Sequence, residues 1–327
     1  MKRRQLLRSA IGLGAVAALG PLASEGGLRW QRRVLVGFGT TLMLEAAHED
    51  DATLAHALDR AVEALQRIEA QMSLYREDSA LSRLNRDGAL AVAPPELREL
   101  LGIAKAVARC SDGAFDPTVQ PLWVAFADAQ RAGRLPTPAE VDAARSLVAW
   151  RDLRLEPGGG VRLARAGMGV TLNGIAQGYA ADRVRAVLEG FGIEHALVDA
   201  GEYAMAGHDP RGAPWTLGIA DPHDEARLVA RLLADGRCVA TSGDGETVFS
   251  ADRRHHHIFD PHTGWSPPGL AGVTVAAASG ALADALTKVM FVAGPGRVAA
   301  LARAWEVDAL WVDKQGRWAA TAGLALT

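Results

Sequence analysis

The stretch ATSGDGETVFSADRRHHHIFDPHTG (residues 240–264) joins two polar clusters through a short apolar segment. Thr241 and Ser242 place two hydroxyl groups beside Gly243, whose missing side chain lets backbone N–H groups approach an anion closely. The second cluster, residues 255–260, is typical of a strand that ends in a turn. The stretch therefore predicts a strand-borne site for an anion such as phosphate. A plain turn followed by an accidental run of histidines is the alternative.

Two kinds of apolar periodicity predict the rest of the secondary structure. Helices are expected over residues 51–72 and 95–111, after a capping box formed by Thr137 and Glu140, from about residue 175, and over 281–292 and 295–305. Strands are expected as a pair within 162–172, and then at 196–199, 215–220, 228–233, 237–241, 248–250, 256–259, 273–277 and 310–312. Hairpin turns are expected at residues 235–236 and 314–316. Because strands and helices do not alternate regularly, the predicted class is α+β, with a mixed or mainly antiparallel sheet and packed helices.

The first residues, MKRRQLLRSAIGLGAVAALGPLA, combine paired Arg3 and Arg4 with an apolar run that is too short to span a bilayer. This pattern resembles a twin-arginine export signal. Residues 1–28 are therefore expected to be the signal and a short leader, with the export machinery as a transient partner and the periplasm as the destination. An uncleaved anchor or a buried helix is the alternative, which the three glycines of the run disfavour.

Composition excludes several classes of protein. Of the 327 residues, 49% are hydrophobic, and no linker or repeat divides them, so residues 29–327 are expected to form a single domain. The formal charge of −3 falls to −7 when the four basic residues of the leader are removed, which argues against nucleic acid as a partner. Cys110 and Cys238 are too few for a disulfide scaffold or a cysteine metal cluster, and their pairing is left open.

Nine segments, taken together and in order, resemble the ApbE family, the FAD:protein FMN transferases, from residue 37 to residue 301. The segments are GFGTTLMLEA (37–46), MSLYREDSALSRLN (72–85), DGAFDPTVQPLW (112–123), TLNGIAQGYAADRV (171–184), HALVDAGEYAMAG (195–207), WTLGIADP (215–222), ATSGD (240–244), HHHIFDPHTG (255–264) and ADALTKVMFVAG (283–294). The resemblance implies an ApbE-like α+β fold for the domain that follows the leader.

The resemblance also implies an activity. It implies binding of FAD and transfer of its FMN half, through a phosphoester, to a threonine or serine of an acceptor flavoprotein, with release of AMP. Charge develops on the pyrophosphate during such a step, so the site needs a divalent cation, Mg²⁺ by the family's pattern, or fixed positive charge, together with a base for the hydroxyl. The acceptor is expected to be a membrane-bound or periplasmic redox protein.

Site residues are carried over from the family's motifs position by position. The residues implied to bind the flavin nucleotide are Met72, Ser73, Tyr75, Ala114, Phe115, Asp116, Thr171, Gln177, His257 and Ile258. Read without the family, Tyr75 is a core aromatic after a helix and Asp116 a turn former before a proline. His257 would contact FAD or help deprotonate the acceptor hydroxyl, and by strand alternation His255 could share its face whereas His256 could not.

The segment from Asp284 to Lys288 departs from the family. The resemblance implies metal ligands at the Gly174 carbonyl, Asp284 and a threonine four residues after Asp284, but that position is Lys288, and Thr287 comes one residue too early. Asp284 and Lys288 are therefore catalytic candidates, and the departure from the family can be interpreted in two ways. Either Thr287 supplies the missing oxygen, or the Lys288 ammonium replaces part of the charge of the metal. A plain surface ion pair is the alternative without the family.

A second departure lies at residues 171–178, where Thr171 and Gln177 stand at positions that the family usually gives to aspartate and lysine. With the lysine at 288, this pattern resembles the periplasmic branch associated with nitrous-oxide respiration, which implies one acceptor rather than many. Two other functions stay open from the sequence: an FAD-binding carrier without transferase activity, and an FAD pyrophosphatase in which water replaces the acceptor hydroxyl.

Overall fold

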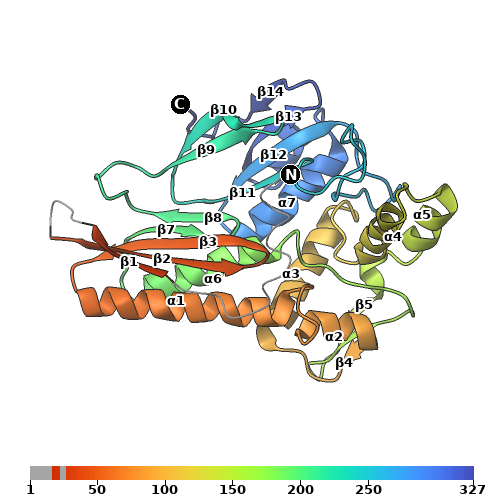
Figure 1. Ribbon diagram of the computed structural model, residues 1–327, viewed down its shortest axis with the longest axis horizontal. Helices are drawn as coiled ribbons and strands as arrows, with labels where there is room; N and C mark the ends of the chain where they lie inside the picture. Colours follow the sequence, from red (N-terminus) through yellow and green to blue (C-terminus); the bar gives the residue numbers. More distant parts are fainter. Residues whose placement is uncertain (1–16, 23–26) are drawn as a thin grey trace.

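A computed structural model describes residues 17–22 and 27–327 of the protein. The paired arginines of the proposed export signal lie outside the described residues. The main sheet has nine strands in the order β1-β2-β3-β7-β8-β11-β12-β13-β14 (Figure 1). Its strands are β1 (Ala17–Leu22), β2 (Arg29–Gly37), β3 (Thr40–His48), β7 (His195–Asp199), β8 (Tyr203–Ala206), β11 (Cys238–Gly243), β12 (Leu270–Ala277), β13 (Asp308–Asp313) and β14 (Trp318–Ala320). All of the pairings within this sheet are antiparallel.

The pairing between β8 and β11 is much shorter than the others. Only Val239 and Tyr203 are register partners there, whereas β11 and β12 pair along their whole length, from Cys238 to Gly243. The Glu202 carboxylate, just before β8, accepts a hydrogen bond from the Thr241 N–H of β11 at 2.9 Å. A side chain thus takes the place of a main-chain hydrogen bond where the two halves of the sheet meet.

Helices cover one face of the main sheet. The helices are α1 (Asp51–Met72), α2 (Ala80–Asp87), α3 (Pro95–Cys110), α4 (Gln120–Arg131), α5 (Pro138–Arg145), α6 (Ala176–Gly190), α7 (Gly280–Ala293) and α8 (Val298–Ala304). In Figure 1, α1 and α6 lie beneath β2, β3 and β7, and α7 packs on β11 and β12. The buried face of α1 carries the three- and four-residue spacing predicted from the sequence, including Leu54, Leu58, Leu65 and Ile68. This layer forms the larger core.

The opposite face of the main sheet is covered by a hairpin of β9 (Thr216–Asp221) and β10 (Asp224–Leu233), which lies above the sheet in Figure 1. Strand alternation divides the residues between the two cores: Val239 and Ala276 face the hairpin side, and Ala240 and Val275 face the helices. A further small sheet pairs β4 (Ala89–Leu90) and β5 (Leu153–Leu155) with β6 (Val161–Leu163), after a short helical turn η2 (Trp150–Asp152).

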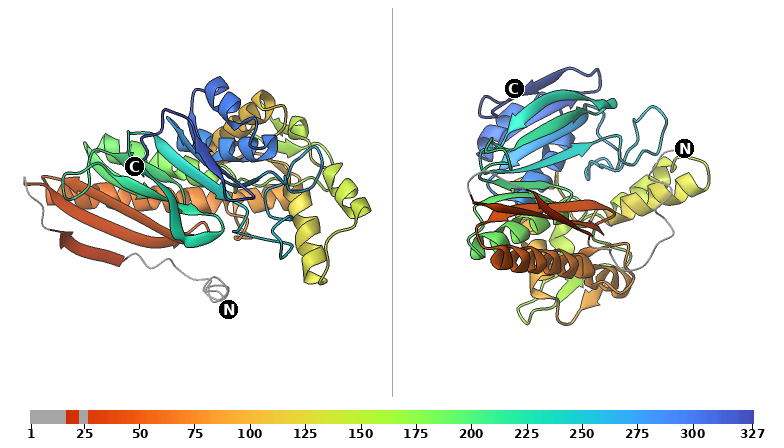
Figure 2. Two further views of the ribbon diagram at one scale, coloured as in Figure 1. Left: turned by 90° about the horizontal axis from the view of Figure 1, so that it is seen from above. Right: turned by 60° about the vertical axis from the view of Figure 1, so that its left-hand side comes forward.

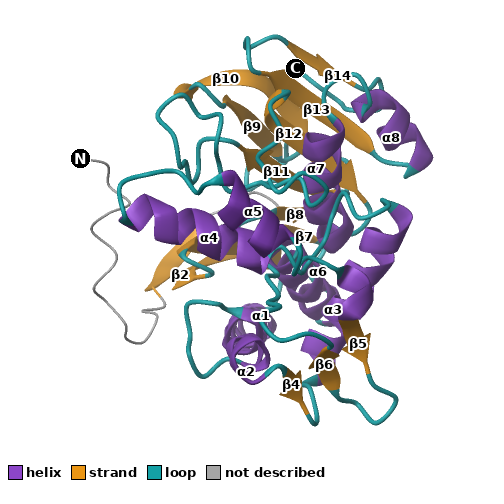
Figure 3. Ribbon diagram, turned by 90° about the vertical axis from the view of Figure 1, so that its right-hand side faces the viewer, coloured by secondary structure: helices purple, strands orange, loops and turns teal. Residues whose placement is uncertain are grey.

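Helices α4 and α5 lie side by side at one end of the molecule, away from the main helical layer (Figures 2 and 3). They share a small aromatic core with the long loop between β11 and β12. Phe126 of α4 packs against Phe249 and Phe259 of this loop, with ring centroids 5.2 and 4.9 Å apart. This aromatic anchor holds the loop, including His255, against α4.

The α+β prediction is confirmed, and most of the predicted elements are present. The strands expected at 248–250 and 256–259 are wrong, since a single bridge between Val248 and His256 joins them and the aromatic anchor draws the segment to α4. The strand pair expected within 162–172 is also wrong: β6 ends at Leu163, and Gly167, with a φ of 82°, turns the chain. The turn at 235–236 joins strands of two different sheets, so it is not a hairpin, whereas the turn at 314–316 does close the β13–β14 hairpin.

Candidate active site

Two helices that begin at the same place organise the candidate site. At the start of α6, a Cβ on Gly178 would lie 2.0 Å from the Gly280 carbonyl oxygen of α7, so only glycine permits the contact. The Gly178 N–H donates to Asp284 Oδ2 of α7 at 3.3 Å. Asp182 of α6 in turn accepts from Gly280 N and Ala281 N, at 2.7 and 3.0 Å, and so ties the N-terminus of α7 to α6. The glycine turn of residues 171–178 is thereby fixed against Asp284.

The centre of the site is an ion pair between the buried Asp284 and the partly buried Lys288. Lys288 Nζ contacts Asp284 Oδ1 one turn away on α7, and the Asp284 side chain is 1% exposed while that of Lys288 is 19% exposed. The aliphatic part of Lys288 lies on the glycine turn, since a Cβ on Gly174 would be 3.1 Å from Lys288 Cε. Burial lowers the pKa of Lys288, but Asp284 and Glu202 outweigh that effect and raise it. Lys288 therefore carries a charge throughout the neutral range.

Thr287 points in another direction. Its hydroxyl donates to the Asp284 carbonyl at 2.7 Å and lies 2.7 Å from the Ser242 hydroxyl of β11, and both hydroxyl side chains are buried. The ATSGD segment thus supports α7 through Ser242 while its neighbour Thr241 binds Glu202 through the backbone. Through these contacts the segment supports the helix and the carboxylate that form the site.

Glu202 is a buried carboxylate to which none of the sequence motifs gives a role. Burial and the nearby Asp284 raise its pKa well above the usual range, and Lys288 opposes that shift. Just before it, Gly201 has a φ of 93°, and a Cβ there would lie 2.1 Å from Gln177 Nε2. The sequence signal was an acidic residue after Ala-Gly between two apolar strands, DAGEYAMA, which is unusual at a buried position unless a partner is near.

Of the three consecutive histidines, His257 is the one that lies beside Lys288 and Glu246. Its Nε2 is 3.8 Å from Glu246 Oε2, and its Nδ1 is buried with no hydrogen-bond partner in the described part of the chain. Burial lowers the pKa of His257, Glu246 opposes this and Lys288 adds to it. The imidazole is therefore neutral near pH 7 and can accept a proton.

The other two histidines face elsewhere. His255 packs against Phe126 and Trp265 with centroids 6.2 and 5.3 Å apart, so the expectation that it could share a face with His257 is wrong. The reason is that the segment is a loop anchored on α4 rather than an alternating strand. His256 is fully buried against Phe291 of α7, and burial lowers its pKa to about 3.

The residues predicted for the flavin pocket lie in three settings. The side chains of Met72, Phe115 and Ile258 belong to the main core, so only their backbones could face a nucleotide. Ser73 is buried, and its hydroxyl accepts from the Tyr75 N–H at 3.2 Å. Tyr75 itself is exposed beside the β2–β3 turn, where a Cβ on Gly39 would be 3.8 Å from its ring, so the core interpretation of Tyr75 is wrong.

The segment at 114–118 is joined to the glycine turn by the backbone, with the Thr171 N–H donating to the Pro117 carbonyl at 2.8 Å. Asp116 accepts three hydrogen bonds, two from Thr118 at 2.6 and 2.7 Å and one from the Trp150 N–H at 3.0 Å. Ala114, just before it, is partly buried against the main core. The Asp116 carboxylate therefore organises its own turn, and its role toward a nucleotide stays a prediction.

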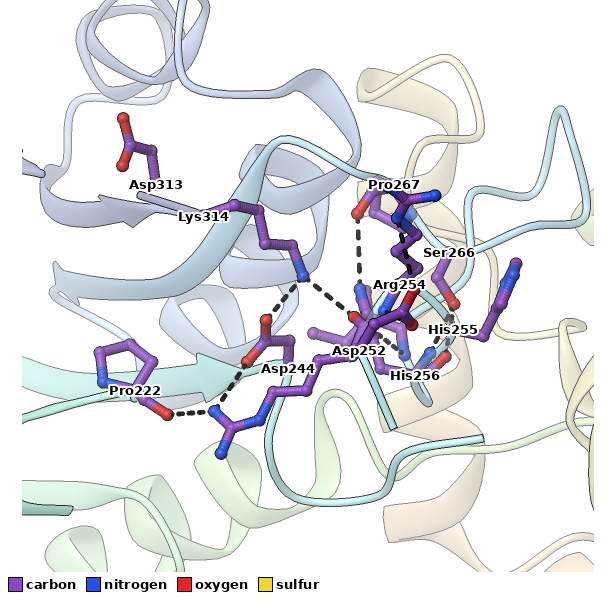
Figure 4. Close-up of polar contacts among 12 residues, drawn as sticks. Pro222, Asp244, Asp252, Arg254, His255, His256, Ser266, Pro267, Asp313 and Lys314 are labelled. Carbon is purple, nitrogen blue, oxygen red and sulfur yellow. Dashed lines mark hydrogen bonds and ion pairs between the residues drawn. The ribbon is translucent and has the colours of Figure 1, made fainter. Parts of the chain in front are cut away.

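A second buried carboxylate fixes the loop that carries His257. Lys314, in the β13–β14 turn, reaches Asp244 Oδ2 at 2.6 Å, and the Arg253 carbonyl accepts from the same ammonium at 3.2 Å (Figure 4). Arg253 Nη1 lies 3.9 Å from Asp244 Oδ1 and donates to the Pro222 carbonyl at 2.6 Å. This group, Asp244, Lys314 and Arg253, is called the loop clamp below.

A cavity of about 210 Å³ lies on the other side of β11 and β12, under the β9–β10 hairpin. Its wall contains Thr241, Thr274 and Pro222, and it reaches the polar cluster only at Ser242 and Glu246. Most of its wall is apolar strand surface. The ion pair of α7 thus lies outside this cavity.

The implied Mg²⁺ does not fit these residues. Asp284 is bound by Lys288 and by Gly178 N–H, the Thr287 hydroxyl is bound by Ser242, and the Lys288 stem lies on Gly174. A dication beside Asp284 would face an ammonium group at contact distance. Across residues 17–22 and 27–327, no three histidine, cysteine or acidic side chains group together as metal ligands.

The model of the ApbE family matches residues 38–311. This chain belongs to the ApbE family. It is 32% identical to the FAD:protein FMN transferase of Treponema pallidum over 334 residues, covering 94% of this chain and 91% of that protein. Among solved structures, it is similar to the ApbE protein of Thermotoga maritima, with 28% identity and a TM-score of 0.80 over 90% of this chain and 97% of that one. The apo form of the Pseudomonas stutzeri flavinyl transferase ApbE is also similar, with 28% identity, a TM-score of 0.77, and coverage of 95% and 96%.

Proposed function

We propose that this ApbE-family chain is an FAD:protein FMN transferase, as its relative from Treponema pallidum is named. One observation carries the proposal: Lys288, Asp284, Glu202 and His257, from three distant parts of the sequence, lie together beside the glycine turn that opens α6. Fixed charge and a neutral imidazole are what a phosphoryl transfer requires. The loop clamp and the α6–α7 contact hold these groups in place.

In the proposed reaction, the hydroxyl oxygen of a threonine or serine on the acceptor flavoprotein bonds to the phosphorus of the FMN half of FAD. The bond between that phosphorus and the bridging oxygen breaks, and the oxygen leaves on AMP. The hydroxyl proton passes to the neutral imidazole of His257. FAD is therefore a substrate, and Lys288 supplies positive charge beside its pyrophosphate. No step is assigned to Mg²⁺, because the residues do not fit it.

The test combines the purified protein, FAD and an acceptor domain that a known FAD:protein FMN transferase labels, with the Vibrio cholerae relative as positive control. We expect AMP release and a gain in acceptor mass in equal amounts. FAD binding without labelling would instead favour a carrier. Free FMN and AMP without any acceptor would favour a pyrophosphatase.

His257→Gln tests the proposed base. We expect the transfer rate to fall by at least about 100-fold, because a positioned base contributes about that much. His255→Gln is the matched control, since His255 packs on α4 and is expected to leave the rate within about twofold. Equal losses in the two variants would contradict the role given to His257.

We also propose that the chain is exported through the twin-arginine route and modifies one membrane-bound or periplasmic redox flavoprotein. The paired arginines and the apolar run support this proposal, together with the resemblance of the lysine-containing pattern to the branch associated with nitrous-oxide respiration. Across the described residues, no helix has both the length and the hydropathy to cross a bilayer. Replacing Arg3 and Arg4 with lysine should leave the protein in the cytoplasmic fraction, and unchanged export would contradict the route.

A further inference from the structure

We propose that Lys288 is the resident cation of this site, so that this chain binds FAD and transfers FMN without a divalent metal ion. The inference rests on the proposed function for the transfer step. It concerns Lys288, the position at which the resemblance implies a metal-ligating threonine.

The position of Lys288 is the first argument. Its ammonium contacts Asp284, and a Cβ on Gly174 would lie 3.1 Å from its Cε, so the lysine side chain lies beside two of the residues to which the resemblance gives metal-binding oxygens. The remaining oxygen, on Thr287, is turned away to Ser242 and to the Asp284 carbonyl. The lysine thus stands where the metal would have to stand.

The direction of the ammonium is the second argument. An ammonium group has three donors, and among the described residues Lys288 is given one hydrogen-bond acceptor, Asp284. The Lys288 side chain is 19% exposed whereas that of Asp284 is 1% exposed, so the lysine is the member of the pair that reaches solvent. Two donors remain for phosphate oxygens.

The charge around Lys288 is the third argument. The groups that act on it electrostatically are Asp284, Glu202 and Glu246, all of them acidic. His257 is the other titratable group nearby, and it feels the positive charge of Lys288. Lys288 thus brings a positive charge to this acidic group of side chains, beside the place proposed for the pyrophosphate.

The experiment compares transfer in a chelator and in magnesium for the wild-type protein, Lys288→Met, Lys288→Thr and Lys288→Arg. FAD affinity is measured in the same buffers from the quenching of flavin fluorescence. Lys105→Met is the matched control, because Lys105 lies on α3 and donates to the Leu153 carbonyl, away from the site. Circular dichroism and the melting temperature identify any variant that does not fold.

We expect wild-type transfer in chelator to stay within about twofold of its value in magnesium. Lys288→Met should lose about 100-fold in both buffers, the usual effect of removing one electrostatic group from such a site, and Lys288→Arg should keep most of the activity. Lys288→Thr should be inactive in chelator and regain transfer in magnesium. Lys105→Met should behave as the wild type.

A wild-type rate that falls more than about tenfold in chelator would overturn the inference, and this measurement needs no variant. Unchanged FAD affinity of a folded Lys288→Met in chelator would also overturn it. If the wild type transfers nothing in either buffer, the proposed function fails. FAD affinity then still decides the role of Lys288, since a loss of at least about tenfold in Lys288→Met would support it.

Discussion

Removal of Lys314 from the loop clamp should destabilise the protein far more than removal of a neighbouring surface cation. The Asp244 side chain is 1% exposed, and Lys314 is its only hydrogen-bond donor among the described residues. Lys314→Met therefore leaves a buried carboxylate with Arg253 at 3.9 Å as the remaining charge. Breaking a buried pair in this way costs about 3–5 kcal/mol, and we expect the lower figure because Arg253 stays.

The assay is urea denaturation at pH 7, with the melting temperature as a second measurement. A loss of about 3 kcal/mol corresponds to a decrease of roughly 5 °C for a domain of this size, at about 2.1 cal/mol/K of unfolding entropy per residue. Arg317→Met is the matched control from the same hairpin: Arg317 pairs with Asp313 but is 79% exposed, so its loss should cost less than about 1 kcal/mol. Adding Asp244→Asn to Lys314→Met should recover stability. Equal costs for the two single variants, or no recovery in the double variant, would refute the reasoning.

Three other changes test the packing around the site. Gly178→Ala should lower the free energy of unfolding by at least about 3 kcal/mol, because its Cβ would meet the Gly280 carbonyl at 2.0 Å. Gly190→Ala, at the open end of the same helix, should be neutral or stabilising, and thermal denaturation measures both. Burial lowers the pKa of His256 to about 3 in the folded state, so the unfolded state binds the proton first as the pH falls. The wild-type protein should therefore lose about 2 kcal/mol of its free energy of unfolding between pH 7 and pH 5 that His256→Leu does not lose, as measured in urea. Asp182→Ala should cost about 1–2 kcal/mol in the same assay, since it removes the acceptor for the Gly280 and Ala281 N–H groups at the start of α7. A smaller effect than that of replacing an exposed aspartate would contradict this role.

Periodicity alone predicted α1 to the residue and the capping box of α5, because both depend on local contacts that the sequence displays. The loop with the three histidines was predicted wrongly as strand, since the Phe126 anchor that removes it from the sheet is more than a hundred residues away. The family motifs led to Asp284, Lys288 and His257, which the structure brings together. They did not lead to Glu202, whose importance depends on burial and on a partner across the sheet.

The short pairing between β8 and β11 has a consequence for motion. One register pair joins the strands β1 to β8 to the strands β11 to β14, so the two half-sheets are connected mainly by the helices and by the Glu202–Thr241 hydrogen bond. The candidate site lies on this seam, with Glu202 on one half and Lys288 packed on the other. A nucleotide bound there would contact both half-sheets and restrict their relative motion. Amide hydrogen exchange along β8 and β11 should therefore slow on FAD binding more than exchange in β2 and β3.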